Sequence, residues 1–246
     1  MITNLKKMMK FKDKKVVLLQ SGGLDSCFLA SLFSYMDYEV HHLFIDYGQN
    51  AKNQERKAVE RIVEYYGGEL HCVTINMPWL KDSTLLAGHE VEEYEVPKKM
   101  GSVIAGTYVP MRNHVLLSIA SSLAESLDIQ YIASGIDGRE DLLHKPQTGC
   151  PDKHPTFVKK FEKSITEGST LKHMKHGKFT LLTPLVGATK EDTICVGYYN
   201  LNTRFDLSWT CYNNTKEPCG KCCACIDRAL HFKNVGLEDP ALKNKF

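Results

Sequence analysis

Residues 21–26, with the sequence Ser-Gly-Gly-Leu-Asp-Ser, carry the clearest chemical pattern of this chain. They follow the apolar run 16–19, which predicts a buried strand, and an apolar helix is predicted over 24–36. Such a turn directs backbone N–H groups and the positive end of the helix at one point, where glycine lets an anion approach. The hexad therefore predicts a phosphate- or pyrophosphate-binding loop, with Asp25 and Ser26 capping the helix. An ordinary strand-to-helix turn of small residues is the alternative.

The spacing of Gly22 and Gly23 excludes two common phosphate-binding loops. A kinase-type P-loop requires G-x-x-x-x-G-K-[ST], and no lysine follows the glycines here. A dinucleotide-binding turn requires G-x-G-x-x-G, whereas these two glycines are adjacent and a third is missing. The loop therefore belongs to another class of anion-binding turn.

A second group of reactive side chains lies near the C-terminus, where cysteines cluster at positions 211, 219, 222, 223 and 225. Consecutive C-x-x-C steps allow thiolates to bind one tetrahedral ion, and a closed set of four sulfurs favours zinc. We expect Cys211, Cys219, Cys222 and Cys225 to hold a structural zinc ion. Cys223 is then the one cysteine of the cluster that does not bind the metal. The alternatives are that Cys223 replaces a neighbouring ligand, that the thiols are free, or that a C-x-x-C pair performs redox chemistry.

Composition limits the classes of protein to consider. The chain has 246 residues, 43% of them hydrophobic, which suits one large domain with a sizeable core. The net charge of +2 argues against a dedicated nucleic-acid binder. Residues 1–15 lack the apolar segment of a secretory signal, and no apolar run is long enough to span a bilayer. We expect a cytoplasmic protein without membrane partners, in which clustered thiols indicate metal binding over disulfides.

The elements that must position these residues alternate between strands and helices. Strands are predicted over 15–20, 38–45, 70–75, 129–133 and 179–185, and helices over 24–36, 54–66, 114–127, 156–167 and 189–198. This order predicts an α/β fold with three layers and a doubly wound parallel sheet, whose ligands bind beyond the carboxyl ends of the strands. The long irregular stretch 76–108 is expected to be a lid or a substrate loop.

Three sequence features together resemble one family. These are the hexad, the segment Val109-Pro110-Met111-Arg112-Asn113 and the terminal C-x7-C-x2-C-x2-C pattern. They are similar, in order and over nearly the whole chain, to the 7-cyano-7-deazaguanine synthases of the queuosine pathway, which are PP-loop ATP pyrophosphatases with an adenine nucleotide alpha-hydrolase-like fold. The resemblance implies a flexible tail at 1–14, a PP-loop domain at 15–205 and a zinc-binding segment with four cysteine ligands at 206–246.

The resemblance also implies an activity and its participants. The family adenylates 7-carboxy-7-deazaguanine with ATP and couples it to ammonia, giving the nitrile through an amide and releasing AMP and pyrophosphate. The implied cofactors are ATP, Mg²⁺ and Zn²⁺, and the implied assembly is a homodimer. A protein partner is left open, and a nucleic-acid partner is not expected.

Residue roles follow from the same resemblance. ATP would contact Ser21, Gly22, Gly23, Leu24, Asp25, Ser26, Tyr47, Gln49, Arg112, Asn113 and Gly135. Catalysis would fall to Asp25, Ser26, Arg112 and Lys190, and substrate binding to Arg112 and Asp152. The alternatives are that Asn113 caps a helix with Arg112 in solvent, and that Lys190 is a surface lysine.

The chain departs from the family pattern on the substrate side. Asn50-Ala51 replaces an Arg-His pair after Tyr-Gly-Gln, Met111 replaces a glycine, and residues 150–154 differ from the pattern Y-P-D-C-R. One alternative is therefore a divergent member that joins the acid to another amine or stops at the amide. Others are a PP-loop sulfurtransferase or amidotransferase acting on tRNA and a zinc-bearing module that binds ATP without turnover. Cys150, on an irregular stretch, is a further candidate for contact with substrate.

Overall fold

The structure is a computed structural model that describes residues 8–9, 11, 13–80, 83–86, 88, 108–138, 151–170 and 177–242. Its centre is a five-stranded sheet in the order β3-β2-β1-β4-β5. The strands are β1 (Lys15–Leu19), β2 (Glu39–Asp46), β3 (Glu69–Thr74), β4 (Tyr131–Ala133) and β5 (Thr180–Leu182). Every paired strand is parallel to its neighbour, so all carboxyl ends meet at one edge.

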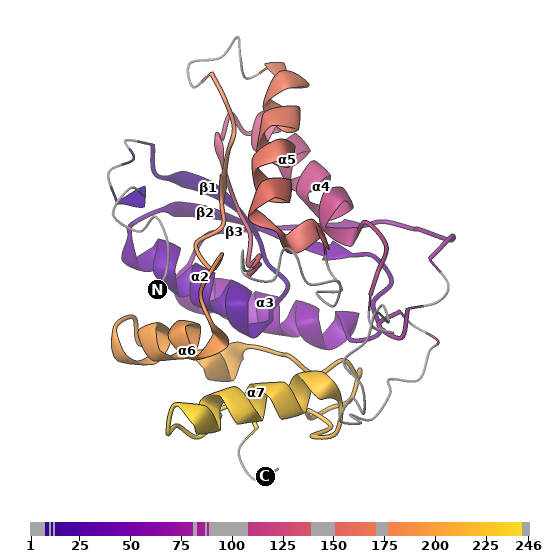
Figure 1. The fold of residues 1–246 in the computed structure, drawn as a ribbon, viewed down its shortest axis with the longest axis vertical. Helices are drawn as coiled ribbons and strands as arrows, with labels where there is room; N and C mark the ends of the chain where they lie inside the picture. The colour runs from indigo at the N-terminus through magenta and orange to yellow at the C-terminus, as the bar shows by residue number, and fades with distance from the viewer. Residues whose placement is uncertain are drawn as a thin grey trace.

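Helices cover both faces of this sheet (Figure 1). On one side lie α2 (Leu24–Tyr35), α3 (Lys52–Tyr66) and α6 (Lys190–Tyr199), with α7 (Cys223–Asn234) packed against α6. The other side carries α4 (Arg112–Ser126) and α5 (Pro155–Glu167). The predicted three-layer α/β architecture is therefore confirmed.

A separate hydrophobic core fills each side of the sheet. Val16 and Leu18 of β1 point into the core that holds Phe28 and Phe33 of α2, whereas Val17 points into the opposite core. Strand residues alternate between the two faces, so a fully apolar run is required where both faces are covered. This explains why residues 16–18 are all apolar and fully buried in the central strand.

Residues ahead of β1 contact the first core. Met8 is fully buried there, and its carbonyl accepts a hydrogen bond from the Tyr38 hydroxyl at 2.9 Å. Phe11 stacks on Tyr131 with ring centroids 4.5 Å apart. The sequence pattern did not indicate these contacts. The division of the chain at residues 14 and 205 stays a prediction.

Every strand and helix predicted from the sequence occurs within a few residues of its expected bounds. The sequence prediction missed α7 and the short 3₁₀ helices η2 (Pro151–Lys153) and η4 (Phe205–Leu207). Much of the expected lid, 76–108, and Cys150 lie outside the described residues. Among the helices that are described, none has the length and apolar character needed to cross a membrane.

Candidate functional site

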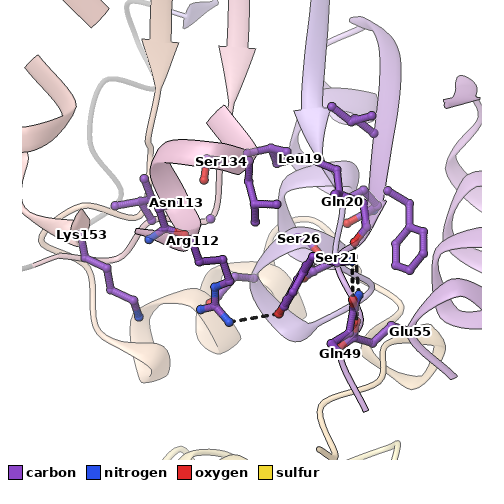
Figure 2. Close-up of a pocket in the computed structure, with 18 residues that line it drawn as sticks. Leu19, Gln20, Ser21, Ser26, Gln49, Glu55, Arg112, Asn113, Ser134 and Lys153 are labelled. Atoms are coloured by element: carbon purple, nitrogen blue, oxygen red, sulfur yellow. Dashed lines mark hydrogen bonds between the residues drawn. The ribbon is translucent and has the colours of Figure 1, made fainter. Parts of the chain in front are cut away.

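A cavity of about 270 Å³ lies at the carboxyl ends of β1, β2 and β4 (Figure 2). Parallel sheets with helices on both faces bind ligands at this edge. The cavity lining includes Ser21, Asp25, Ser26, Tyr47, Gln49, Arg112, Asn113 and Gly135, all of them predicted from the sequence. Distant segments therefore meet as expected, and the described cavity wall is rich in polar groups.

The predicted phosphate loop connects β1 to α2. Gly22 has φ +78°, and a Cβ atom there would lie 2.7 Å from the carbonyl oxygen of Glu55, so only glycine fits. Ser21 Oγ accepts a hydrogen bond from the Gly23 N–H at 3.3 Å and lies 3.3 Å from Ser26 Oγ. These contacts hold the loop in an open turn at the start of the helix.

The predicted capping by Asp25 and Ser26 is wrong. The N-cap residue of α2 is Gly23, which lacks a capping side chain, and Asp25 and Ser26 lie inside the first turn. Ser26 Oγ instead donates to the Gly23 carbonyl at 3.1 Å. A helix start without a side-chain cap keeps its backbone N–H groups available to an anion.

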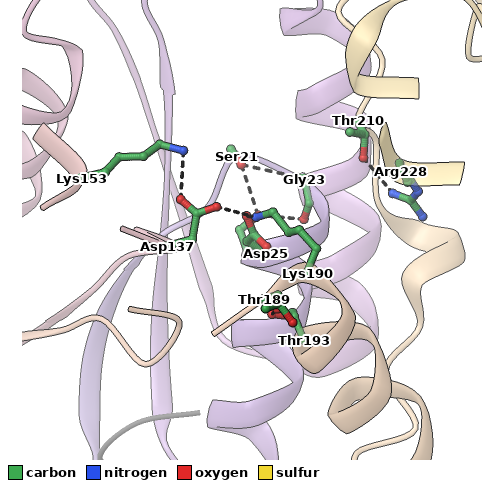
Figure 3. A network of polar contacts seen from close by, with 11 residues as sticks. Ser21, Gly23, Asp25, Asp137, Lys153, Thr189, Lys190, Thr193, Thr210 and Arg228 are labelled. Carbon is green, nitrogen blue, oxygen red and sulfur yellow. Dashed lines mark hydrogen bonds and ion pairs between the residues drawn. The ribbon is translucent and has the colours of Figure 1, made fainter. Parts of the chain in front are cut away.

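A chain of alternating charges lies beside the loop (Figure 3). Lys190 Nζ, at the first residue of α6, contacts Asp25 Oδ2 and lies 2.8 Å from Asp137 Oδ2. Lys153 Nζ lies 2.9 Å from Asp137 Oδ1. Burial alone would lower the pKa of Lys190, but Asp25 and Asp137 outweigh it and raise that pKa above its usual range. Burial would raise the pKa of Asp137, but the two lysines hold it well below its usual range.

Lys190 is therefore a partly buried, charged residue of the site and not a surface lysine. Its side chain is 30% exposed, and it joins the loop after β4 to the first turn of α2. A capping box of Thr189 and Asp192 fixes the start of α6. The capping fixes the backbone from which the Lys190 side chain extends, and Asp25 and Asp137 hold its ammonium group.

Tyr47 and Gln49, after β2, line the opposite wall. Arg112 donates to the Tyr47 hydroxyl at 3.2 Å, so the half-buried guanidinium is directed into the cavity rather than to solvent (Figure 2). Gln49 Nε2 donates to Glu55 Oε2 at 2.9 Å. Burial raises the pKa of Glu55 to about 7, although the bond from Gln49 and the charge of Arg112 lower it.

Asp152 has a different environment from the one expected of a substrate ligand. It is buried, its Oδ2 accepts from the Asn113 N–H at 3.2 Å, and its carbonyl faces Asn113 Nδ2 at 3.4 Å. Asp152 therefore accepts hydrogen bonds from the first turn of α4. Met111, with φ 55°, is the N-cap residue of this helix. The neighbouring Lys153 is the residue that lines the cavity.

Two side chains at the site have buried polar atoms without partners among the described residues. These atoms are Oδ1 of Asp25 and both amide atoms of Gln20, a residue that follows β1 and is 1% exposed. Buried polar groups are costly unless they are hydrogen-bonded. Both residues line the cavity, so a polar ligand there would satisfy them.

The four predicted metal ligands come together. The sulfur atoms of Cys211, Cys219, Cys222 and Cys225 all lie within 4.8 Å of one another, and Cys223 is not in the group. Backbone N–H groups of Cys219 and Cys222 point at the sulfurs of Cys211 and Cys219, at 3.3 and 3.4 Å. Four clustered thiols with N–H donors fit a closed tetrahedral zinc site.

The cysteine cluster packs against the phosphate loop. Trp209 donates from its backbone N–H to the Gly22 carbonyl at 2.8 Å and from its indole to the Cys211 carbonyl at 2.7 Å. Ala51, the N-cap residue of α3, and Ala58, in the second turn of that helix, share the buried cluster of Trp209. The cluster is therefore positioned to support the loop, and it lies outside the cavity.

Among polar and charged side chains, sequence reasoning missed four that lie at the site: Gln20, Glu55, Asp137 and Lys153. Gln20 and Asp137 follow buried strands at the carboxyl edge, which was the available signal. Gly138 also escaped notice. A Cβ atom there would lie 1.8 Å from the Lys153 carbonyl oxygen, so this glycine allows two loops of the site to touch.

Fold and site together define an α/β protein of the PP-loop type. Comparison with known proteins then gives the family, because the family model described as "Queuosine biosynthesis protein QueC" matches residues 15–236. The chain belongs to this family. Its membership makes the chain an enzyme of the ATP-dependent carbon–nitrogen ligase class.

Curated relatives agree with this assignment. A 7-cyano-7-deazaguanine synthase of Thermoplasma acidophilum is 33% identical over 236 residues, covering 95% of this chain and 93% of its own. The synthase of Methanospirillum hungatei is 31% identical, covering 92% and 98%. That of Persephonella marina is 32% identical, covering 95% and 99%.

Proposed function

We propose that this enzyme adenylates 7-carboxy-7-deazaguanine with ATP and couples it to ammonia, forming 7-cyano-7-deazaguanine through an amide. One observation carries the proposal: the uncapped start of α2 adjoins a polar cavity that also holds Lys153 and Arg112. Relatives that match more than nine-tenths of this chain are named for the same product. The combination supports phosphate binding next to a site for a second substrate.

ATP phosphates would bind at residues 21–26, where Ser21 and Ser26 offer hydroxyl groups and α2 offers N–H groups. Lys190 adds positive charge beside the loop. The free oxygen of Asp25 is a donor that suits Mg²⁺, which when bound would offset phosphate charge. Leu24 and Gly135 would shape the pocket, since Gly135 brings its backbone close to Asp25.

In this reaction no side chain needs to form a covalent bond with the substrate. A substrate carboxylate oxygen attacks the α-phosphorus of ATP. The bond from this phosphorus to the pyrophosphate group breaks, and pyrophosphate leaves with the bonding electron pair. Ammonia then attacks the acyl carbon, loses a proton and displaces AMP, which gives the amide. The amide oxygen then attacks the α-phosphorus of a second ATP and displaces pyrophosphate, and loss of AMP and of both amide protons gives the nitrile. The cations around the loop would stabilise the charge that develops on phosphate.

Substrate recognition would fall to the wall opposite the loop. Arg112 is directed into the cavity by Tyr47 and suits a carboxylate or a phosphate. Asp152 would act by holding the start of α4, and with it Arg112, in place. Gln20 offers an amide to a polar edge of either ligand. We also propose that Cys211, Cys219, Cys222 and Cys225 hold a zinc ion that supports the fold, and that the enzyme is a homodimer.

Pyrophosphate release tests the proposal. Purified enzyme with ATP and Mg²⁺ should release pyrophosphate only when 7-carboxy-7-deazaguanine is present, and mass spectrometry should detect the nitrile once ammonia is added. Asp25→Asn should lower the rate by roughly a hundredfold or more. Glu64→Gln, an exposed carboxylate of α3 that does not line the cavity, is the matched control.

Other products would redirect the assignment. An accumulating amide, or a product formed only with another amine, would identify a divergent family member. Pyrophosphate release that requires tRNA would contradict the proposal in favour of RNA modification. A sample that binds ATP without cleaving it under any condition would indicate a binding module.

A further inference from the structure

A second group of metal-ligating side chains lies on β2 and β3, outside both the cavity and the cysteine cluster. His41 of β2 pairs in register with Glu69 of β3, and His71 lies two residues further along β3. These residues precede Asp46 and Thr74, which end the two strands at the edge that carries the cavity. The group is therefore at the other end of the sheet.

We propose that His41, His71 and Glu69 form a binding site for a divalent late first-row metal ion such as zinc or cobalt. The donor atoms already form a triangle. His41 Nδ1 lies 3.1 Å from His71 Nε2 and 3.5 Å from Glu69 Oε2, and His71 Nε2 lies 3.6 Å from Glu69 Oε1. Metal–ligand bonds of about 2.1 Å in tetrahedral geometry separate donor atoms by about 3.4 Å, so an ion bound by both nitrogens and one Glu69 oxygen requires only small side-chain shifts and the loss of the proton shared by the two histidines.

Glu39 provides a contact that is common in metal sites, a carboxylate that accepts a hydrogen bond from a metal-binding histidine. Its Oε1 lies 3.2 Å from His41 Nε2, the ring nitrogen that does not face the triangle. A carboxylate that accepts from the second nitrogen fixes the tautomer and leaves Nδ1 free to bind the metal. Lys15 holds Glu39 in turn, at 3.2 Å.

Exposure and charge also suit a bound ion. His41 is 7% exposed and fixed, whereas the side chains of His71 and Glu69 are 21% and 65% exposed. An ion can therefore enter from solvent, and one coordination position stays open to water. Glu69 neutralises part of its double positive charge directly, and Glu39, which also pairs with Lys15, adds negative charge behind His41. The ion would join the edge strand β3 to β2.

Cobalt binding tests the proposal on untagged, full-length protein whose cysteine cluster has first been given one equivalent of zinc. We expect one further Co²⁺ per chain in equilibrium dialysis, with the absorption of a tetrahedral nitrogen–oxygen site and without thiolate-to-cobalt charge transfer. His71→Gln and Glu69→Gln should abolish this binding. Glu39→Gln should keep the stoichiometry but weaken the affinity roughly tenfold or more.

His231→Gln is the matched control, because His231 also pairs with a carboxylate, Glu191, at 2.8 Å and lies on another element. It should leave cobalt binding unchanged. The proposal fails if wild-type protein binds no Co²⁺ beyond the cysteine cluster, or if the extra ion persists in both His71→Gln and Glu69→Gln. The wild-type spectrum alone decides the matter if those variants do not fold.

Discussion

The backbone N–H of Trp209 lies 2.8 Å from the Gly22 carbonyl and donates to it, which ties the cysteine segment to the phosphate loop. The same tryptophan bonds the Cys211 carbonyl through its indole. Order in the cysteine cluster is therefore transmitted to Gly22 through one residue. Gly22 has a left-handed backbone and α2 has no capping side chain, so this contact adds support from outside the loop to the hydrogen bonds of Ser21 and Ser26 within it.

On the proposal that the cysteine cluster holds zinc and the loop binds ATP, removal of this metal should weaken ATP binding, although none of the cluster's cysteines lines the cavity. Cys219→Ser, or treatment with a strong chelator, should raise the dissociation constant for ATP roughly tenfold and lower the melting temperature. Titration with a fluorescent ATP analogue measures the first effect. Cys223→Ser is the control, because Cys223 neighbours the cluster without belonging to it. If Cys219→Ser and Cys223→Ser lose the same ATP affinity, the effect does not depend on the metal ligands, and the prediction is wrong.

Lys190→Met should reduce pyrophosphate release by roughly a hundredfold or more, because the change removes the cation shared by Asp25 and Asp137. The two carboxylates would then repel each other and the ATP phosphates. Steady-state kinetics with the acid substrate measures the loss. Lys160→Ala, an exposed lysine of α5, should retain wild-type activity. Full activity of the Lys190→Met enzyme would show that Lys190 does not take part in catalysis.

Glu55 should make stability depend on pH near neutrality. Burial raises its pKa in the folded protein to about 7 from an ordinary value of 4.5. The folded state therefore holds a proton that the unfolded state has lost between these values, and stability falls as pH rises from about 4.5 to about 7. Above pH 7, Glu55→Gln should be more stable than the wild type by up to roughly 3 kcal/mol.

Urea unfolding across this pH range measures the difference between the two proteins. Below the ordinary pKa, Glu55 is neutral in both the folded and the unfolded state. The unfolding free energies of the wild type and Glu55→Gln should therefore converge at low pH. Glu64→Gln should track the wild type at every pH. If Glu55→Gln differs from the wild type by the same free energy at every pH, folding does not shift the pKa of Glu55, and the prediction is wrong.

Met111→Gly should stabilise the protein by about 1 kcal/mol, since Met111 has φ 55° at the start of α4 and its side chain is exposed. Glycine removes the strain of a left-handed backbone, although it adds entropy to the unfolded chain. Met111→Val should have the opposite effect, because a β-branched side chain tolerates this backbone poorly. Thermal unfolding of both variants provides the test, and equal melting temperatures would contradict it.

Asp239→Asn should destabilise the enzyme by about 3–5 kcal/mol. Arg228 and Asp239 form an ion pair at 2.7 Å with side chains only 2% and 5% exposed. Arg228 also donates to Ser208 Oγ and Thr210 Oγ1, on either side of Trp209. Denaturant unfolding measures the loss. Asp206→Asn, which breaks the more exposed pair with Arg204, should cost less than about 1 kcal/mol.

Local patterns in the sequence were sufficient to predict the strands and helices, the glycine turn after β1 and the clustering of the four cysteines, because each depends on residues that are close together in the chain. Helix α7 was missed because its buried face contains the charged Arg228 between Cys225 and Phe232, which interrupts the apolar periodicity. The arrangement of Asp25, Asp137, Lys153 and Lys190 could not be predicted either. Those residues come from four separate segments, and only the folded chain shows that Lys190 contacts both carboxylates.

The order of the chain has a consequence for biosynthesis. The phosphate loop is complete by residue 26, but the hydrogen bond that supports Gly22 comes from residue 209. A nascent chain on the ribosome therefore carries an unsupported loop until more than four-fifths of the polypeptide has emerged. On the proposal that this loop binds ATP, nucleotide affinity would be acquired late in synthesis, and prematurely terminated products would not compete with the finished enzyme for ATP.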